Sequence, residues 1–185
     1  MSYDKMNREI EKYLKQNNLP VSGKASDTEE ETDRRLAAYA QGRDFVVDKW
    51  LEEKKYKELV SVVHGGWFGD EAVLVPLANY FVREKETEWL KFLCERKIRH
   101  LCEDTLSCLK AQQEVFPNKD QAFSDDQLEK TLAKTLEKID RYIGFLEPAN
   151  CPEYLERIRE LKKKAESLTM KPNDLKIIKA KAPNN

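Results

Sequence analysis

The sequence predicts an all-α protein, an irregular helical bundle or a short stack of antiparallel helical hairpins with six to eight helices. Apolar residues recur at spacings of three and four along most of the 185-residue chain, which is the period of one helix face. Glycine and proline are scarce, at 6 and 7 residues. Charged residues make up 36% of the chain, above the usual quarter, because each surface helix exposes a wide charged face. No segment favours a strand over a helix.

The N-terminal part of the chain predicts three helices. Residues 3–16 carry one apolar stripe, and Pro20 lies just beyond its end. The stripe consists of Tyr3, Met6, Ile10, Tyr13 and Leu14. An exposed acidic loop is expected at about 20–32, where glycine, serine and carboxylates occur together. A second helix covers about 31–54, and a short third helix follows at about 55–64.

The second helix has a defined apolar side and one interior glycine. Gly42 lies in its middle and could divide it into two shorter helices, because glycine is a poor helix former. The side expected to face the core consists of Leu36, Tyr39, Ala40, Val46, Val47, Trp50 and Leu51.

The stretch HGGWFGDEAVLVP, residues 64–76, predicts a helix–turn–helix connection. Gly65 and Gly66 tolerate the left-handed backbone that often ends a helix. Asp70 can cap the next helix, with Glu71 in its first turn, where the helix dipole favours a carboxylate. The turn therefore has a structural explanation for each of its polar residues.

The segment from Ala72 to Val82 is apolar nearly all round and predicts the central, buried helix of the fold. Pro76 complicates it, because proline lacks an amide donor and disfavours a helical residue before it. The helix either kinks there or restarts with Pro76 at its first position.

Three further helices are predicted, at about 86–113, 125–147 and 152–168, the last beginning at Pro152. We expect one helical domain over residues 1–169 and a basic tail over 170–185. The residues expected to face inward are Leu90, Cys94, Ile98, Leu101, Thr105, Cys108 and Leu109, then Leu128, Leu132, Leu136, Ile139, Ile143 and Leu146, then Tyr154, Ile158, Leu161, Ala165 and Leu168.

Four potential metal ligands lie close in sequence: Cys94, His100, Cys102 and Cys108. Structural zinc sites usually use cysteine pairs two to four residues apart, whereas these cysteines are eight and six apart. Helix geometry puts Cys94 and Cys108 on the apolar face and His100 roughly opposite. We therefore expect buried, unliganded thiols and neither a metal nor any other cofactor.

The sequence also predicts no catalytic residue. It lacks a Gly-x-Ser-x-Gly elbow, a Walker loop, a His-Glu-x-x-His motif and an EF-hand loop. The run RKIRH, residues 96–100, resembles the Arg-x₄₋₆-His motif of HEPN-type ribonucleases, although three residues separate its Arg and His. This resemblance implies a helical nuclease in which Arg96 and His100 bind phosphate and transfer protons. The alternative explanation is an exposed basic helix face.

The N-terminus has no apolar core of signal-peptide length, and no apolar run reaches the roughly 18 residues of a membrane span. We therefore expect a soluble cytoplasmic protein with reduced cysteines. The net charge is −1, and the C-terminal end is the basic part. If the chain bound nucleic acid, it would use Lys162, Lys163, Lys164, Lys171, Lys176, Lys179 and Lys181.

The favoured function is a non-enzymatic protein-binding module. Its partner-binding residues would be Trp67, Phe68, Asp70 and Glu71, because an aromatic anchor ringed by charge is typical of a binding hot spot. The alternative is that the two rings fill the gap between diverging helices. The most concrete version is a small cytosolic inhibitor or immunity-type protein that neutralises a basic partner such as a toxin or nuclease. The sequence leaves the oligomeric state open.

Overall fold

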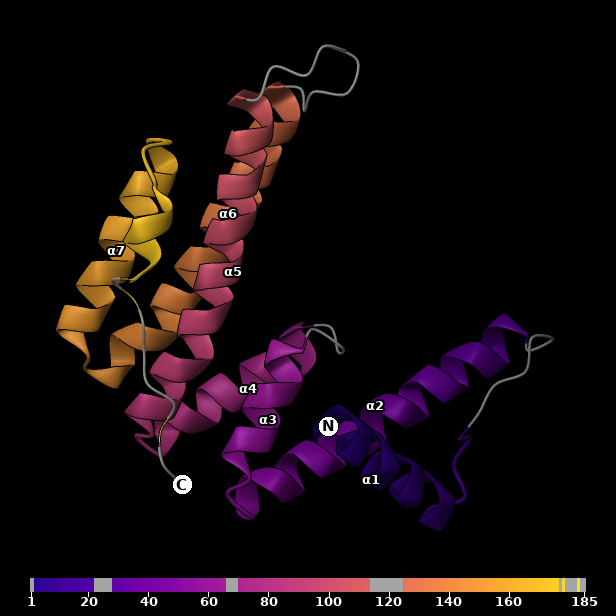
Figure 1. The fold of residues 1–185 in the computed structure, drawn as a ribbon. Coiled ribbons are helices and arrows are strands. Elements are labelled where there is room, and N and C mark those ends of the chain that lie inside the picture. Colours follow the sequence, from indigo (N-terminus) through magenta and orange to yellow (C-terminus); the bar gives the residue numbers. More distant parts are fainter. Residues whose placement is uncertain are drawn as a thin grey trace. The chain divides into compact units, whose positions relative to one another are not determined.

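The computed structural model describes residues 2–21, 28–65, 70–113, 125–176, 178 and 183, with the side chains of all of these except 70–71, 108–113 and 125–128. Across these ranges the chain forms seven α-helices and two short 3-10 helices, with no strand (Figure 1). The predicted all-α fold is thereby confirmed. The chain divides into two compact units, Met1–Leu77 and Ala78–Asn185, and each is described by itself.

The first unit is built on helices α1 (Ser2–Gln16), α2 (Glu29–Glu52) and α3 (Tyr56–His64), which pack on one another. Thr28 starts α2 through a capping box, in which its hydroxyl accepts from the Glu31 amide and the Glu31 carboxylate accepts from the Thr28 amide. The largest fully buried side chains of this unit are Met6, Ile10, Leu14, Trp50, Leu59 and Leu77. The predicted stripe of the first helix therefore forms part of this core.

Gly42 does not divide α2, which is one continuous helix. A Cβ atom at Gly42 would lie 3.0 Å from Ile10 Cγ2 and 3.3 Å from Tyr13 Cδ1. Such contacts are too tight for a side chain to enter without displacing its neighbours. The glycine therefore lies where α1 packs tightly against α2, and the expected break was wrong.

The predicted core side of α2 is correct only for its C-terminal part. Val46, Val47, Trp50 and Leu51 are buried, whereas Leu36 is 60% exposed. The first buried residue of α2 is Ala38, so Leu36 lies two residues before the buried part of the helix. The spacing of apolar residues in α2 extends beyond the buried part of the helix. The sequence pattern therefore assigned Leu36 to the core side.

Helix α4 (Asp70–Arg83) contains the boundary between the two units. It runs without interruption through Pro76, which is exposed, so the helix does not restart at the proline. Its buried side chains are Val73, Leu74, Leu77, Ala78 and Phe81. The helix before it ends at Gly65 in a right-handed conformation, with φ −75° and ψ −14°, whereas Gly66, the other glycine expected to allow a left-handed backbone, lies outside the described residues.

The second unit continues with α5 (Thr87–Gln113), α6 (Asp125–Leu146) and α7 (Pro152–Glu166). Helix α6 packs against both α5 and α7, as Figure 1 shows. The short helix η2 (Glu147–Ala149) and a left-handed Asn150 turn the chain between α6 and α7. Pro152 is the first residue of α7, as predicted. The largest fully buried side chains here are Phe81, Leu90, Leu93, Ile98, Ile139 and Leu146.

The described part of the C-terminal segment packs on the helices of the second unit, to which it belongs. Helix η3 (Pro172–Lys176) contacts α5, and Met170, Leu175 and Ile178 are buried. The Tyr154 hydroxyl lies 3.3 Å from the Lys91 carbonyl and 3.1 Å from the Ile178 carbonyl, to which it donates. The basic composition of this segment did not predict these contacts.

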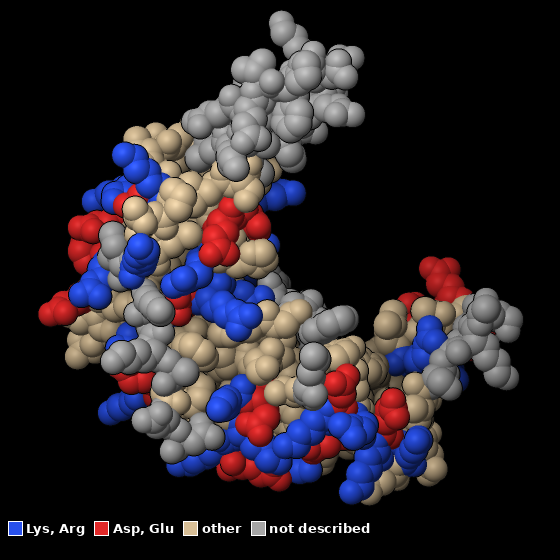
Figure 2. Space-filling model, viewed as in Figure 1, with Lys and Arg blue, Asp and Glu red and all other residues tan. Residues whose placement is uncertain are grey.

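The surface of both units carries charges of both signs. In Figure 2, lysine and arginine side chains alternate with aspartate and glutamate over the visible face, as expected for solvated helix faces. Among the residues that the structure describes, no helix combines the length and the apolar character needed to cross a bilayer.

Candidate functional site

The turn predicted as the partner-binding site lies largely outside the described residues. This holds for Trp67 and Phe68 entirely and for the side chains of Asp70 and Glu71. The described part of helix α4 begins at Asp70, and the predicted cap by the Asp70 side chain lies outside the described residues. The binding role of this turn stays a prediction.

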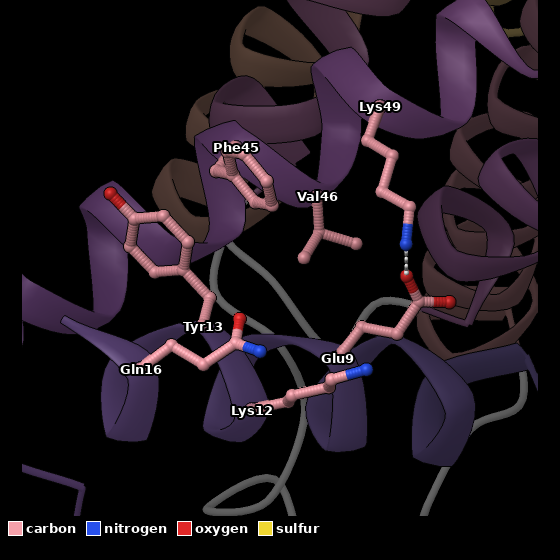
Figure 3. Close-up of a pocket in the computed structure, with 7 residues that line it drawn as sticks. All are labelled: Glu9, Lys12, Tyr13, Gln16, Phe45, Val46 and Lys49. Carbon is pink, nitrogen blue, oxygen red and sulfur yellow. Dashed lines mark hydrogen bonds and ion pairs between the residues drawn. The ribbon is translucent and has the colours of Figure 1, made fainter.

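A different candidate site lies within the first unit, where α1 and α2 pack together. An open pocket of about 450 Å³ separates part of their facing sides, and we call it the α1–α2 groove (Figure 3). Its lining residues are Glu9, Lys12, Tyr13 and Gln16 of α1 and Phe45, Val46 and Lys49 of α2. The four α1 residues follow the spacing of a single helix face, so α1 presents a continuous polar and aromatic stripe to the groove.

One end of the groove is aromatic. The rings of Tyr13 and Phe45 stack with centroids 4.5 Å apart and an interplanar angle of 27°. Phe45 is nevertheless 49% exposed, whereas the neighbouring Val46 is fully buried. The stack holds the Phe45 ring in place and leaves apolar surface in contact with water.

The other end of the groove is charged. The Lys49 Nζ donates to Glu9 Oε2 at 2.7 Å, and the Trp50 indole Nε1 donates to Glu9 Oε1 at 3.0 Å (Figure 3 shows the lysine contact). Partial burial opposes ionisation of Glu9, but the hydrogen bonds from Lys49 and Trp50 outweigh it and lower the pKa of the carboxyl. The hydrogen bond to Glu9 raises the pKa of Lys49. Glu9 is therefore an ionised carboxylate with a donor on each oxygen.

Lys12 has a different environment. Its side chain is exposed, and within the described residues no acceptor or ring contacts it. Because Lys49 neutralises Glu9, the charge that the groove offers to solvent is mainly that of Lys12. Apolar stacking beside an available positive charge suits the binding of an apolar group next to an anion.

Arg96 and His100 both have exposed side chains on α5. The His100 imidazole is 71% exposed, and its Nδ1 lies 3.6 Å from Asp104 Oδ1, one turn further along the helix. The two residues thus share an exposed, charged helix face, and the ribonuclease-like interpretation stays a prediction. Neither lines the α1–α2 groove.

The predicted burial of Cys94 is confirmed, and Cys102 is buried as well. Burial raises the pKa of the Cys94 thiol, and it raises that of Cys102 to about 12. Such thiols stay protonated and weakly nucleophilic at neutral pH. The Cys108 side chain lies outside the described residues, and in the described part of the chain no group of three or more potential ligands is placed to hold a metal ion.

The basic C-terminal residues are partly neutralised by the protein itself. Lys162 Nζ lies 2.7 Å from Asp140 Oδ1, and Lys164 Nζ lies 2.7 Å from Asp174 Oδ1. Lys163, Lys171 and Lys176 are exposed, whereas Lys179 and Lys181 lie outside the described residues. These ion pairs reduce the positive charge that could face a phosphate backbone.

Comparison of the chain with known protein families, with curated proteins and with solved structures gave no match in any of the three.

Sequence reasoning missed Phe45, which belonged neither to the predicted core nor to the predicted site. The signal that could have found it is Gly42, three residues earlier. A glycine inside a long amphipathic helix often marks a close approach of another backbone. An aromatic residue one turn from such a contact lies at the edge of the helix pair, where it is half covered.

Proposed function

We propose that this chain is a protein-binding module that holds a segment of its partner in the α1–α2 groove. The observation that carries the proposal is the half-exposed Phe45 ring, stacked on Tyr13 in an open pocket. Rigid aromatic side chains are the commonest anchors of protein interfaces, because they bury a large area with little loss of conformational freedom. The pocket volume suits a few side chains of a partner and not a folded domain.

A more specific version is a small cytoplasmic inhibitor or immunity-type protein that neutralises a toxin or nuclease. Two features support it. The chain up to residue 152 has a slight excess of acidic side chains, which favours the approach of a basic partner. The turn containing Trp67, Phe68, Asp70 and Glu71 would supply a second contact. In this version the groove holds one segment of the partner while the wider surface guides its association.

The test compares proteins captured by the wild-type chain with those captured by Phe45→Ala. Leu36→Ala is the matched control, since Leu36 is also a large exposed apolar residue of α2 but lies outside the groove. A protein retained by wild type and Leu36→Ala but lost with Phe45→Ala is then purified and titrated by calorimetry. We expect Phe45→Ala to weaken its binding by about 2 kcal/mol or more, roughly 30-fold.

Circular dichroism of Phe45→Ala shows whether the helices are retained. Equal affinity of a purified partner for Phe45→Ala and for wild type would move the binding surface away from the groove. The turn at residues 64–71 would then be the next surface to test.

A further inference from the structure

We infer that the segment held in the α1–α2 groove carries a bulky apolar side chain and, about 6 Å further along, a carboxylate. This inference rests on the proposed function and specifies the chemistry of the partner at that site. The apolar side chain would lie against Tyr13 and Phe45, and the carboxylate would lie between Lys12 and Lys49. The spacing corresponds to the rise of α1 from the charged end of the groove at Glu9 to its aromatic end at Tyr13.

The apolar part of this inference follows from the aromatic end. Phe45 uses one side of its ring for the stack on Tyr13 and remains 49% exposed. The exposed part of the Phe45 ring is apolar and offers no hydrogen-bonding group, although the polar Gln16 also lines the groove on the Tyr13 side (Figure 3). An aromatic or leucine side chain would remove this apolar surface from water, whereas a small or polar side chain would not.

The preference for a carboxylate follows from which charged groups of the groove already have partners within the protein. Both oxygens of Glu9 accept hydrogen bonds within the protein, and the lowered pKa of this carboxyl reflects them. A basic side chain of the partner would have to compete with Lys49 and Trp50 for Glu9. A carboxylate displaces no existing contact, because Lys12 has no described partner and the Lys49 ammonium, which has three donors, gives one to Glu9. The ion pair with Lys49 offsets the negative charge of Glu9, so the carboxylate is placed nearer to Lys12 than to Glu9.

The charges of the groove contribute more to the choice of partner than to the affinity of binding. Lys12 is exposed, and an ion pair between exposed groups contributes little affinity. Juxtaposed like charges, in contrast, are strongly unfavourable, so a basic segment is rejected and an acidic one is tolerated. The groove therefore prefers a sequence opposite in charge to the basic partner suited to the rest of the surface. Both preferences can hold for one partner that carries an acidic, apolar segment on a basic body.

The test pans a phage library of random peptides against the full-length protein and measures the enriched peptides by fluorescence anisotropy. We expect them to combine an aromatic residue or leucine with Asp or Glu. Lys12→Glu should weaken their binding by about tenfold and should favour versions in which Lys replaces the acid. Lys15→Glu is the matched control, since it makes the same charge change on an exposed residue of α1 that does not line the groove.

The possible outcomes separate the inference from the proposed function. Peptides that lose affinity with Phe45→Ala but respond equally to Lys12→Glu and Lys15→Glu would overturn the acidic requirement and leave the groove as a binding site. Peptides whose affinity Phe45→Ala does not change would contradict the proposed function as well. Failure to enrich any peptide would overturn the inference alone, because a purified partner still tests the function.

Discussion

At the scale of single residues, Gly42 decides how closely α1 and α2 approach. Gly42→Ala adds a methyl group 3.0 Å from Ile10 Cγ2, where it meets a buried side chain of the opposite helix. We expect a loss of about 1–3 kcal/mol in the free energy of unfolding, because an overpacked contact must shift. The better helix propensity of alanine offsets up to about 1 kcal/mol of this. Urea denaturation measures the difference.

Gly144→Ala is the matched control for Gly42→Ala. Gly144 also lies inside a helix, α6, but a Cβ atom there meets nothing within 4 Å. Alanine should therefore stabilise the protein at this position by about 0.5–1 kcal/mol. If both substitutions stabilised the chain, the close approach of α1 to Gly42 would be wrong.

Glu9 makes the α1–α2 contact depend on pH. Its pKa in the folded protein is lowered, so its contribution to stability is complete above the pKa of the unfolded chain, about 4.3, and is lost as the pH falls through the lower folded value. Glu9→Gln removes this titration. The stability advantage of wild type over Glu9→Gln should therefore shrink between about pH 7 and about pH 3.

The comparison with Glu9→Gln is needed because other carboxyls titrate in the same range. Glu31 and Asp174 also have lowered pKa values, held by Thr28 and Lys164 respectively. Their contributions are common to wild type and variant and cancel in the difference. A wild-type advantage that is constant over this pH range would show that Glu9 gains nothing from Lys49 and Trp50 when it ionises.

At the scale of elements, the spacing of apolar residues predicted each α-helix and most of its buried residues. In α7 the expected seam of Ile158, Leu161 and Ala165 is buried. Leu168 continues the same spacing but is 46% exposed, because α7 ends at Glu166 and Leu168 adopts a left-handed backbone with φ 54°. The spacing of apolar residues predicts a buried helix face only where both the helix and a neighbouring helix are present. Beyond the end of either one, an apolar residue that continues the spacing is exposed. Leu36 of α2 is exposed because it lies beyond the part of α2 that packs on a neighbouring helix.

The candidate site was harder to predict than the helices. A groove between two helices depends on the distance and the crossing angle between them. The spacing of apolar residues along one helix predicts neither. Tyr13 was expected on the apolar stripe, and only the position of α2 shows that its ring faces Phe45 at the edge of the core. The ion pair of Glu9 and Lys49 joins residues forty positions apart, so no local pattern could reveal it.

At the scale of the whole molecule, two compact units share one uninterrupted helix. Helix α4 contributes Val73, Leu74 and Leu77 on one side of the boundary and Ala78 and Phe81 on the other. The sequence predicts a single helical domain over residues 1–169, and we expect such a domain to unfold in one cooperative step. Loss of packing in either unit would then remove the support of α4 for both.

Matched core truncations test this cooperativity. Ile10 of α1 and Ile158 of α7 are both fully buried, and each substitution by alanine should cost about 2–5 kcal/mol. The slowest-exchanging amides of a cooperative domain exchange only through global unfolding. Ile10→Ala should therefore lower the hydrogen-exchange protection of the slowest amides in α6 as much as in α2. Ile158→Ala should likewise lower the protection of the slowest amides in α2 as much as in α6. Protection lost only in the unit that carries the substitution would mean that each unit is a domain of its own, with α4 as the segment that joins them.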